Sequence, residues 1–127
     1  MKLLLALLCR NADQNEDETL NAHCIFHVLQ SNSFPVTPRP FALLCQFKAE
    51  KQHCGETLQV LVTLRDERGE SVFEREKEID VPREMWTPVI SAFVAVGCEF
   101  ARAGTYTFEI ELDGEAAGKI ELEVSRS

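Results

Sequence analysis

The fold is decided by residues 105–124, TYTFEIELDGEAAGKIELEV, in which apolar and polar side chains alternate on either side of a turn. Successive side chains of a β-strand point to opposite faces of the sheet, so the apolar residues of each arm share one face and the polar residues the other. Gly114 to Gly118 supply the turn chemistry. The segment therefore predicts an antiparallel hairpin with one buried face and one solvated face.

The same period of two occurs upstream, at Leu58 to Arg65 and again at Ser71 to Ile79, with the turn residues 66–70 between them. We expect these arms to form another hairpin. Three further segments are apolar on both faces and are expected to be central or covered strands: Leu20 to Gln30, Pro40 to Ala49 and Val89 to Phe100. A helix over Thr87 to Cys98 is the competing interpretation of the last of these, although its β-branched residues and Gly97 favour a strand.

The N-terminus combines Lys2 with the apolar run Leu3 to Leu8, so it resembles the start of an export signal. An export signal needs roughly 7 to 15 apolar residues followed by small residues, and a membrane span needs about 20. Because the run is shorter, we expect a buried first strand bounded by the polar loop Arg10 to Glu18. An exported or envelope-attached domain remains the alternative.

These segments describe one domain, residues 1–127, that is all-β and consists of about seven to eight short strands. Their lengths, with turn signals between them, are typical of an antiparallel sandwich. The chain carries 13 Lys and Arg against 21 Asp and Glu, a formal net charge of −8. Such a charge makes nucleic acid and anionic membranes poor partners. The five cysteines contain no closely spaced pair, so no zinc or redox motif is present and a reducing cytoplasm is the expected compartment.

A resemblance rests on the order of these segments and on Ala103 to Gly114, AGTYTFEIELDG. The chain resembles a family of small, functionally uncharacterised bacterial β-sandwich proteins, and the motif is similar to the closing hairpin of many Ig-like sandwiches. The resemblance implies a cytoplasmic Ig-like sandwich with no assigned catalytic residue. Antibody-type domains match less well, because Trp86 lies far beyond Cys24 and Val96 replaces the expected Tyr two residues before Cys98. A disulfide between Cys24 and Cys98 is therefore not expected.

The closing hairpin also supplies the main candidate surface, formed by Glu109, Glu111, Glu121 and Glu123 on its outer face. In register, these carboxylates would form an acidic patch tempered by Lys119 and by Arg75 or Lys77 from another strand. Such a patch is a solvated face that keeps the protein soluble, a docking surface for a basic partner, or a site for calcium or acid–base catalysis. The run 74–78, EREKE, is typical of an edge strand protected against aggregation.

Met85 and Trp86 form a second candidate contact, because both residue types are favoured at binding surfaces. The alternative is that Trp86 covers one end of the core. Apolar side chains on both faces of Leu3 to Leu8 and Val89 to Val96 leave area for something to cover, and a homodimer is the expected solution.

A metal-binding or small-ligand-binding protein is the alternative function, and it would use His23, His27, His53 or Cys54. Residues four apart on a strand lie about 13 Å apart, too far for one ion to join His23 and His27 directly. No nucleophile elbow or phosphate loop is present. We therefore expect no enzyme and no cofactor, but a small acidic interaction or accessory module that binds an unidentified protein partner.

Overall fold

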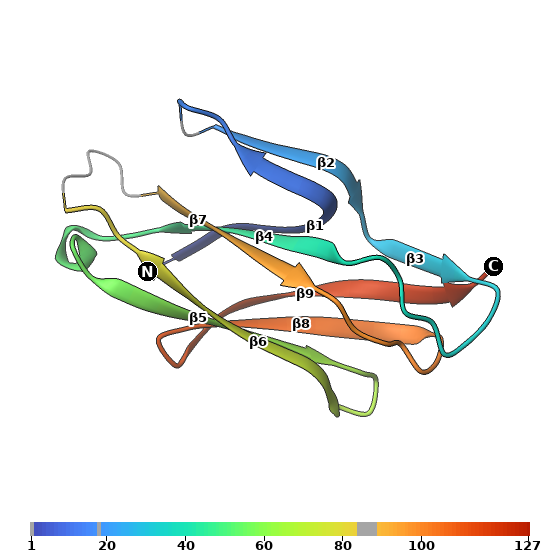
Figure 1. Cartoon of the computed structure of the whole chain (residues 1–127). Coiled ribbons are helices and arrows are strands. Elements are labelled where there is room, and N and C mark those ends of the chain that lie inside the picture. The colour runs from blue at the N-terminus through green and yellow to red at the C-terminus, as the bar shows by residue number, and fades with distance from the viewer. Residues whose placement is uncertain (1, 18, 84–88) are drawn as a thin grey trace.

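The computed structural model describes residues 2–17, 19–83 and 89–127, which form two β-sheets packed face to face (Figure 1). The strands are β1 (Lys2–Gln14), β2 (Leu20–Phe26), β3 (Val28–Ser31), β4 (Phe41–Lys48), β5 (Thr57–Arg65), β6 (Ser71–Asp80), β7 (Val89–Val96), β8 (Gly104–Leu112) and β9 (Glu115–Arg126). A 3-10 turn, η1 (Lys51–His53), joins β4 to β5. The all-β prediction is confirmed, but the described residues form nine strands where seven to eight were expected.

One sheet has the order β2-β1-β4-β7 and the other has the order β3-β9-β8-β5-β6. Both expected hairpins are confirmed, with Leu58 opposite Ile79 and Phe108 opposite Ile120. The turn of the closing hairpin contains Asp113 and Gly114, whose φ angles are 48° and 82°. These left-handed values suit the turns whose twist matches that of paired strands, which explains why Asp-Gly occurs there. Strand β7 also confirms the strand interpretation over the helix for residues 89–96.

The inner faces of the two sheets meet in one apolar core. Its largest fully buried side chains come from both sheets and from the segment before β8: Phe47, Phe100, Phe108, Leu8, Leu43, Leu64, Ile110, Leu122, Val60, Val62 and Val94. The ring of Phe41, on β4, meets the ring of Phe108, on β8, edge to face at 6.4 Å between centroids. Edge-to-face pairs of this kind contribute about 1 kcal/mol beyond the area they bury.

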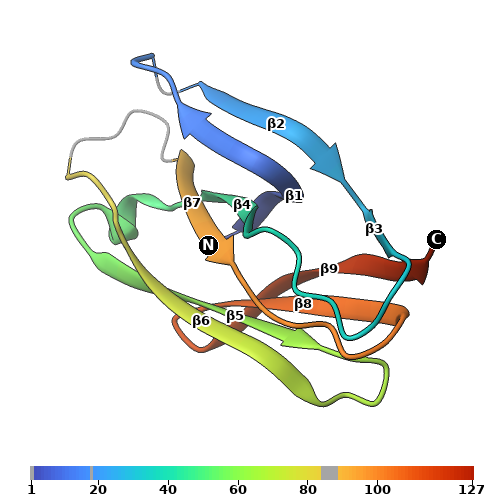
Figure 2. The same ribbon diagram turned by 45° about the vertical axis from the view of Figure 1, so that its right-hand side comes forward.

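The segment Leu20 to Gln30 does not form the single covered strand that was expected. It divides at His27 into β2, at one edge of the four-stranded sheet, and β3, at one edge of the five-stranded sheet. Strand β3 runs parallel to β9, from Val28 opposite Glu123 to Ser31 opposite Arg126, so the prediction of purely antiparallel pairing is wrong here. The run crosses between sheets without reversing direction, and it therefore meets the last strand in parallel (Figure 2).

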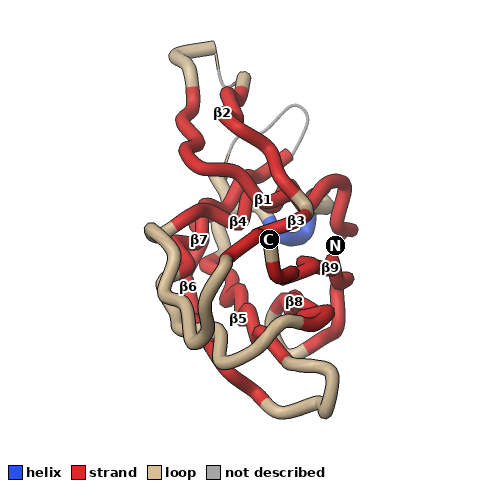
Figure 3. The backbone as a smooth tube through the Cα atoms, turned by 90° about the vertical axis from the view of Figure 1, so that its right-hand side faces the viewer, coloured by secondary structure: helices blue, strands red, loops and turns tan. Residues whose placement is uncertain are grey.

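Strand β1 extends to Gln14, into the region expected to be a polar loop. Its first half pairs with β4 and its second half pairs with β2, so the strand bridges two partners. The hairpin of β1 and β2 forms one end of the four-stranded sheet and projects away from the five-stranded sheet (Figure 3). The expectation of a buried first strand is also wrong in part, because Leu4 and Leu5 are 45% and 40% exposed. A register shift between Leu3 and Leu5 displaces these side chains from regular alternation.

Two basic side chains of the edge strand β6 form hydrogen bonds to the edge strand β7 of the other sheet. Arg75 and Lys77 lie opposite Val62 and Val60, so their side chains start from the inner face of the five-stranded sheet. Lys77 Nζ donates to the carbonyl of Phe93 at 2.5 Å, and Arg75 donates to the carbonyl of Ala95 at 3.3 Å. These two residues therefore do not temper the acidic patch as expected. Inward-pointing charges protect an edge strand, which agrees with the edge role predicted for residues 74–78.

We expect Lys77→Met to lower the free energy of unfolding by about 1 to 2 kcal/mol, because the Phe93 carbonyl loses its charged donor while the apolar stem of the side chain is retained. Urea denaturation followed by circular dichroism measures the change. Glu76→Gln is the matched control, since Glu76 is the adjacent exposed residue and its side chain points away from the core. A variant Lys77→Met as stable as the control would show that the bond to β7 contributes nothing.

Candidate functional site

The acidic patch predicted on the closing hairpin exists as one face of the five-stranded sheet. Glu109 and Glu111 alternate with the buried side chains of β8, and Glu121 and Glu123 alternate with those of β9. All four carboxylates therefore lie on the outer side of the sheet, away from the core. The prediction that these four residues share one outer face is confirmed.

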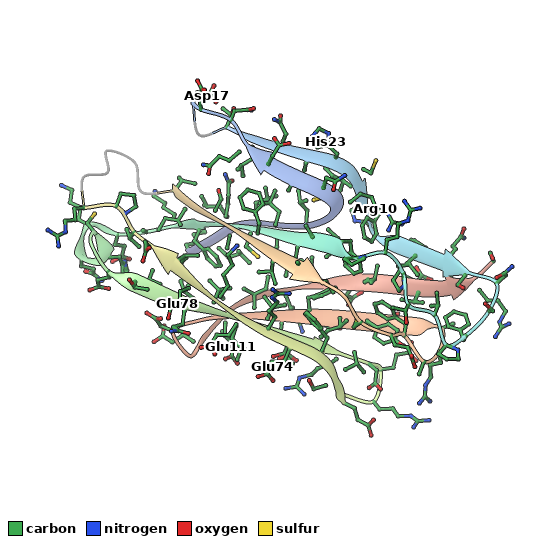
Figure 4. All side chains as sticks on the ribbon, in the orientation of Figure 1. Arg10, Asp17, His23, Glu74, Glu78 and Glu111 are labelled. Atoms are coloured by element: carbon green, nitrogen blue, oxygen red, sulfur yellow. The ribbon has the colours of Figure 1, made fainter. Side chains whose placement is uncertain are left out.

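Strand β6 adds three carboxylates that sequence reasoning did not assign to this surface. Glu76 and Glu111 both lie beside Leu61 of β5, and Glu74 and Glu109 both lie beside Thr63. Figure 4 shows Glu74, Glu78 and Glu111 together on the outer side of the five-stranded sheet, far from Arg10 and His23. We call this surface the acidic face and define it by Glu74, Glu76, Glu78, Glu109, Glu111, Glu121 and Glu123. Alternation within 71–79 was the signal that could have found the added residues.

Carboxylates of the closing hairpin do not stand opposite one another, as the in-register prediction required. Glu109 lies opposite Lys119, whereas Glu121 and Glu123 lie opposite Thr107 and Thr105. A register shift between Ile110 and Glu111 moves Glu111 opposite Ala116. The arrangement avoids the repulsion of directly opposed like charges.

Two basic residues, Arg65 and Lys119, share the acidic face. Arg65 Nε lies 3.0 Å from Glu109 Oε1, and both side chains are about 40% exposed. An ion pair this exposed stabilises the fold little, since water screens it. Gln59 Nε2 also donates to Glu78 Oε1 at 3.2 Å. Most carboxylates of the face therefore keep oxygens available to solvent or to a partner.

The acidic face is not uniform in shape. A shallow hollow of about 410 Å³ lies between β8 and β9, lined by Glu109, Ile110, Glu111, Ala116, Ala117, Gly118 and Lys119. Ala116 lies opposite Glu111 on this face, and its small side chain leaves this space above the sheet. The half-buried Leu61 lies between Glu76 and Glu111 and provides an apolar point within the charged surface. A hollow and an apolar point are the features on which a protein partner can be anchored.

The structure does not bring the candidate metal ligands together. His23 lies on β2 with Nε2 at 3.5 Å from Asp13 Oδ2, and His27 lies just after that strand. His53 Nδ1 accepts the backbone N–H of Glu50 at 3.1 Å, within the turn that joins β4 to β5. Within residues 2–17, 19–83 and 89–127, no group of three His, Cys, Asp or Glu residues is arranged to hold a metal ion.

All five cysteines are free thiols, and three of them are shielded from reaction. Burial raises the pKa of Cys45 to about 12 and that of Cys98 to about 11, and it also raises the pKa of Cys9. A raised pKa keeps these thiols protonated, so they lack the thiolate that a nucleophile or metal ligand needs. Cys24 is exposed and Cys54 is half-buried, each in a different region of the fold.

The remaining candidates concern apolar surface. Met85 and Trp86 lie outside the described residues. The area expected to support a homodimer is represented by Leu4, Leu5 and Val89, of which Val89 is 39% exposed. Over the described part of the chain, no helix has the length and apolar character needed to cross a membrane.

The protein-family model DUF6941, described as a family of unknown function, matches residues 4–125. The chain belongs to this family. The match extends from β1 to β9, so it covers both sheets and every residue of the acidic face. No curated protein matches the sequence.

Because the pKa of Cys45 is raised, the stability of the fold is expected to decrease at alkaline pH. The unfolded thiol loses its proton near pH 9.0, whereas the folded thiol retains it up to about pH 12. The contribution is therefore fully present below pH 9 and is lost as the pH rises, by about 1.4 kcal/mol per pH unit for one thiol. Urea denaturation at several values between about pH 8 and about pH 10.5 measures this slope.

We expect Cys45→Ala to lower stability below pH 9, where the thiol is protonated in both states, and to remove the contribution of this thiol to the loss of stability at higher pH. Leu43→Ala is the control, because Leu43 is also fully buried on β4 and carries no titratable group. Equal alkaline slopes for the two variants would refute the assignment to Cys45.

Proposed function

We propose that the chain is a non-catalytic protein-interaction or accessory module of the cytoplasm, and that its acidic face docks a basic partner. The observation that carries the proposal is the concentration of seven carboxylates with Arg65 and Lys119 on one sheet face. A face with one predominant sign of charge attracts an oppositely charged partner and sets its orientation. The same face would repel nucleic acid and anionic lipid.

The shape of the face supports docking of a folded protein or a basic segment. The hollow between β8 and β9 is bordered by Glu109 and Glu111, so a Lys or Arg side chain entering it would meet carboxylates directly. Leu61 would add an apolar contact beside them. Rim charges of this kind mainly raise association rates, whereas anchors in hollows slow dissociation.

We further infer that the two-sheet architecture is Ig-like. The parallel pairing of β3 with β9, after a strand that crosses between sheets, supports this relation. A second support is Tyr106, near the start of β8, whose hydroxyl donates to the carbonyl of Arg102 at 2.7 Å. A tyrosine bonded to the backbone just upstream of its strand is a feature of Ig-type sandwiches. Its ring packs edge to face on Phe100 at 4.9 Å between centroids.

The test compares two double variants that carry the same charge. Glu111→Lys with Glu121→Lys reverses charges on the acidic face, and Glu16→Lys with Glu56→Lys reverses exposed charges elsewhere. Each reversal adds two charges, so both variants change the formal net charge from −8 to −4. We expect the face variant to stay folded and to lose affinity for the partner by about tenfold or more, because complementary charges are replaced by like charges.

The partner is first recovered by pull-down from the native host with stepwise salt, and its affinity for each purified variant is then measured. Binding should weaken as salt rises, since screening acts on exposed charges. Equal affinity of the face variant and the control variant would reject the acidic face as the docking surface.

A further inference from the structure

A groove lined by basic residues, in contrast to the acidic face, lies where β1, β3 and the segment 36–40 meet. Its volume is about 720 Å³, and it is lined by Arg10, Asn11, Val28, Leu29, Gln30, Val36, Pro38, Arg39 and Pro40. This volume falls in the range of sites that hold a ligand or a short peptide segment. Its walls combine two guanidinium groups, two side-chain amides and several apolar side chains.

The charge of the groove contrasts with that of the chain. Arg10 and Arg39 line it without any Asp or Glu, although the chain has a net charge of −8. The ion pairs among the described residues join His23 to Asp13 and Arg65 to Glu109, so neither groove arginine takes part in one. Two arginines without a carboxylate partner form a local site for anionic groups.

The surroundings hold one guanidinium in place. Arg10 Cζ lies 4.9 Å from the centre of the Phe26 ring. This cation–π contact orders the side chain, and the guanidinium has no carboxylate partner among the described residues. Figure 4 shows Arg10 beside the passage from β2 into β3.

The opposite wall is also fixed before any ligand arrives. Val36 exchanges two backbone hydrogen bonds with Phe100, at 2.8 and 2.9 Å. Pro38 and Pro40 restrict the backbone that follows. A preformed groove reduces the entropy lost on binding.

The floor of the groove offers backbone groups as well as side chains. In the parallel ladder with β9, the carbonyls of His27 and Ser31 accept the N–H groups of Glu123 and Ser127. Backbone groups of a strand point alternately to its two sides, so those of Val28 and Gln30 point away from β9. Both residues line the groove. The free edge of β3 therefore faces it.

We propose that this groove binds an extended acidic peptide, which adds as a strand to the free edge of β3 and places carboxylates on Arg10 and Arg39. Strand addition uses main-chain hydrogen bonds for affinity and alternate side chains for specificity. The apolar side chains of Val28, Val36 and Pro38 suit the uncharged residues between the carboxylates. The site differs from the acidic face in position and sign of charge, so either proposal can fail without the other.

The probe is a short capped peptide in which Glu alternates with Val, titrated into the full chain labelled with nitrogen-15. We expect the amide signals of Val28, Gln30 and Val36 to shift and the amides of Val28 and Gln30 to exchange more slowly. Arg10→Gln and Arg39→Gln should each weaken binding by about tenfold or more, because each removes a charged donor. Arg68→Gln, on the exposed turn between β5 and β6, is the matched control and should leave affinity unchanged.

Two modified probes separate strand addition from simple ion binding. Methylation of every second backbone nitrogen of the peptide should abolish binding for one alternate set and spare the other, since only one set faces β3. The peptide with Gln in place of Glu should bind at least about tenfold more weakly. Equal effects of the two methylated sets, full replacement of the peptide by free glutarate, or signal shifts confined to other surfaces would each overturn the proposal.

Discussion

The contact between the inner faces of β4, β5 and β8 is the interaction on which the rest of the structure depends. Phe41 and Phe108 meet across the two sheets, and the buried residues of β8 occur at strictly alternate positions. Because alternation sends every second side chain outward, the core needs only the inward positions of these strands and leaves most outward positions to polar residues. Seven carboxylates can therefore gather on one outer face without cost to the core.

The edge strands of the two sheets differ in whether their unpaired side is protected by charged side chains. Lys77 and Arg75 of β6 donate hydrogen bonds to backbone carbonyls of β7. Strand β3 is short and has one open side beside two arginines. Open edges favour pairing with another chain, whereas edges with inward charges oppose it. Strand addition is therefore opposed at β6 and β7 but not at β3.

Much of this architecture could be predicted from local pattern. The hairpins of β5 with β6 and β8 with β9 have regular alternation and clear turn residues, so both were predicted. The division at His27 could not be predicted, because the apolar pattern continues through it and the change of sheet depends on distant partners. The inward direction of Lys77 was missed because a charged residue suggests a solvated face, whereas its long stem crosses the core edge. The groove joins residues from separate segments, and no local pattern reports such a meeting.

The parallel ladder of β3 and β9 has a consequence for how the chain reaches its fold. It pairs Val28 with Glu123, residues separated by most of the chain, and closing so long a loop is slow compared with forming a hairpin. During synthesis β3 emerges early but its partner is the last strand of the sandwich. The five-stranded sheet therefore stays incomplete on the ribosome until β9 is exposed, and β3 has no strand of that sheet to pair with before that point.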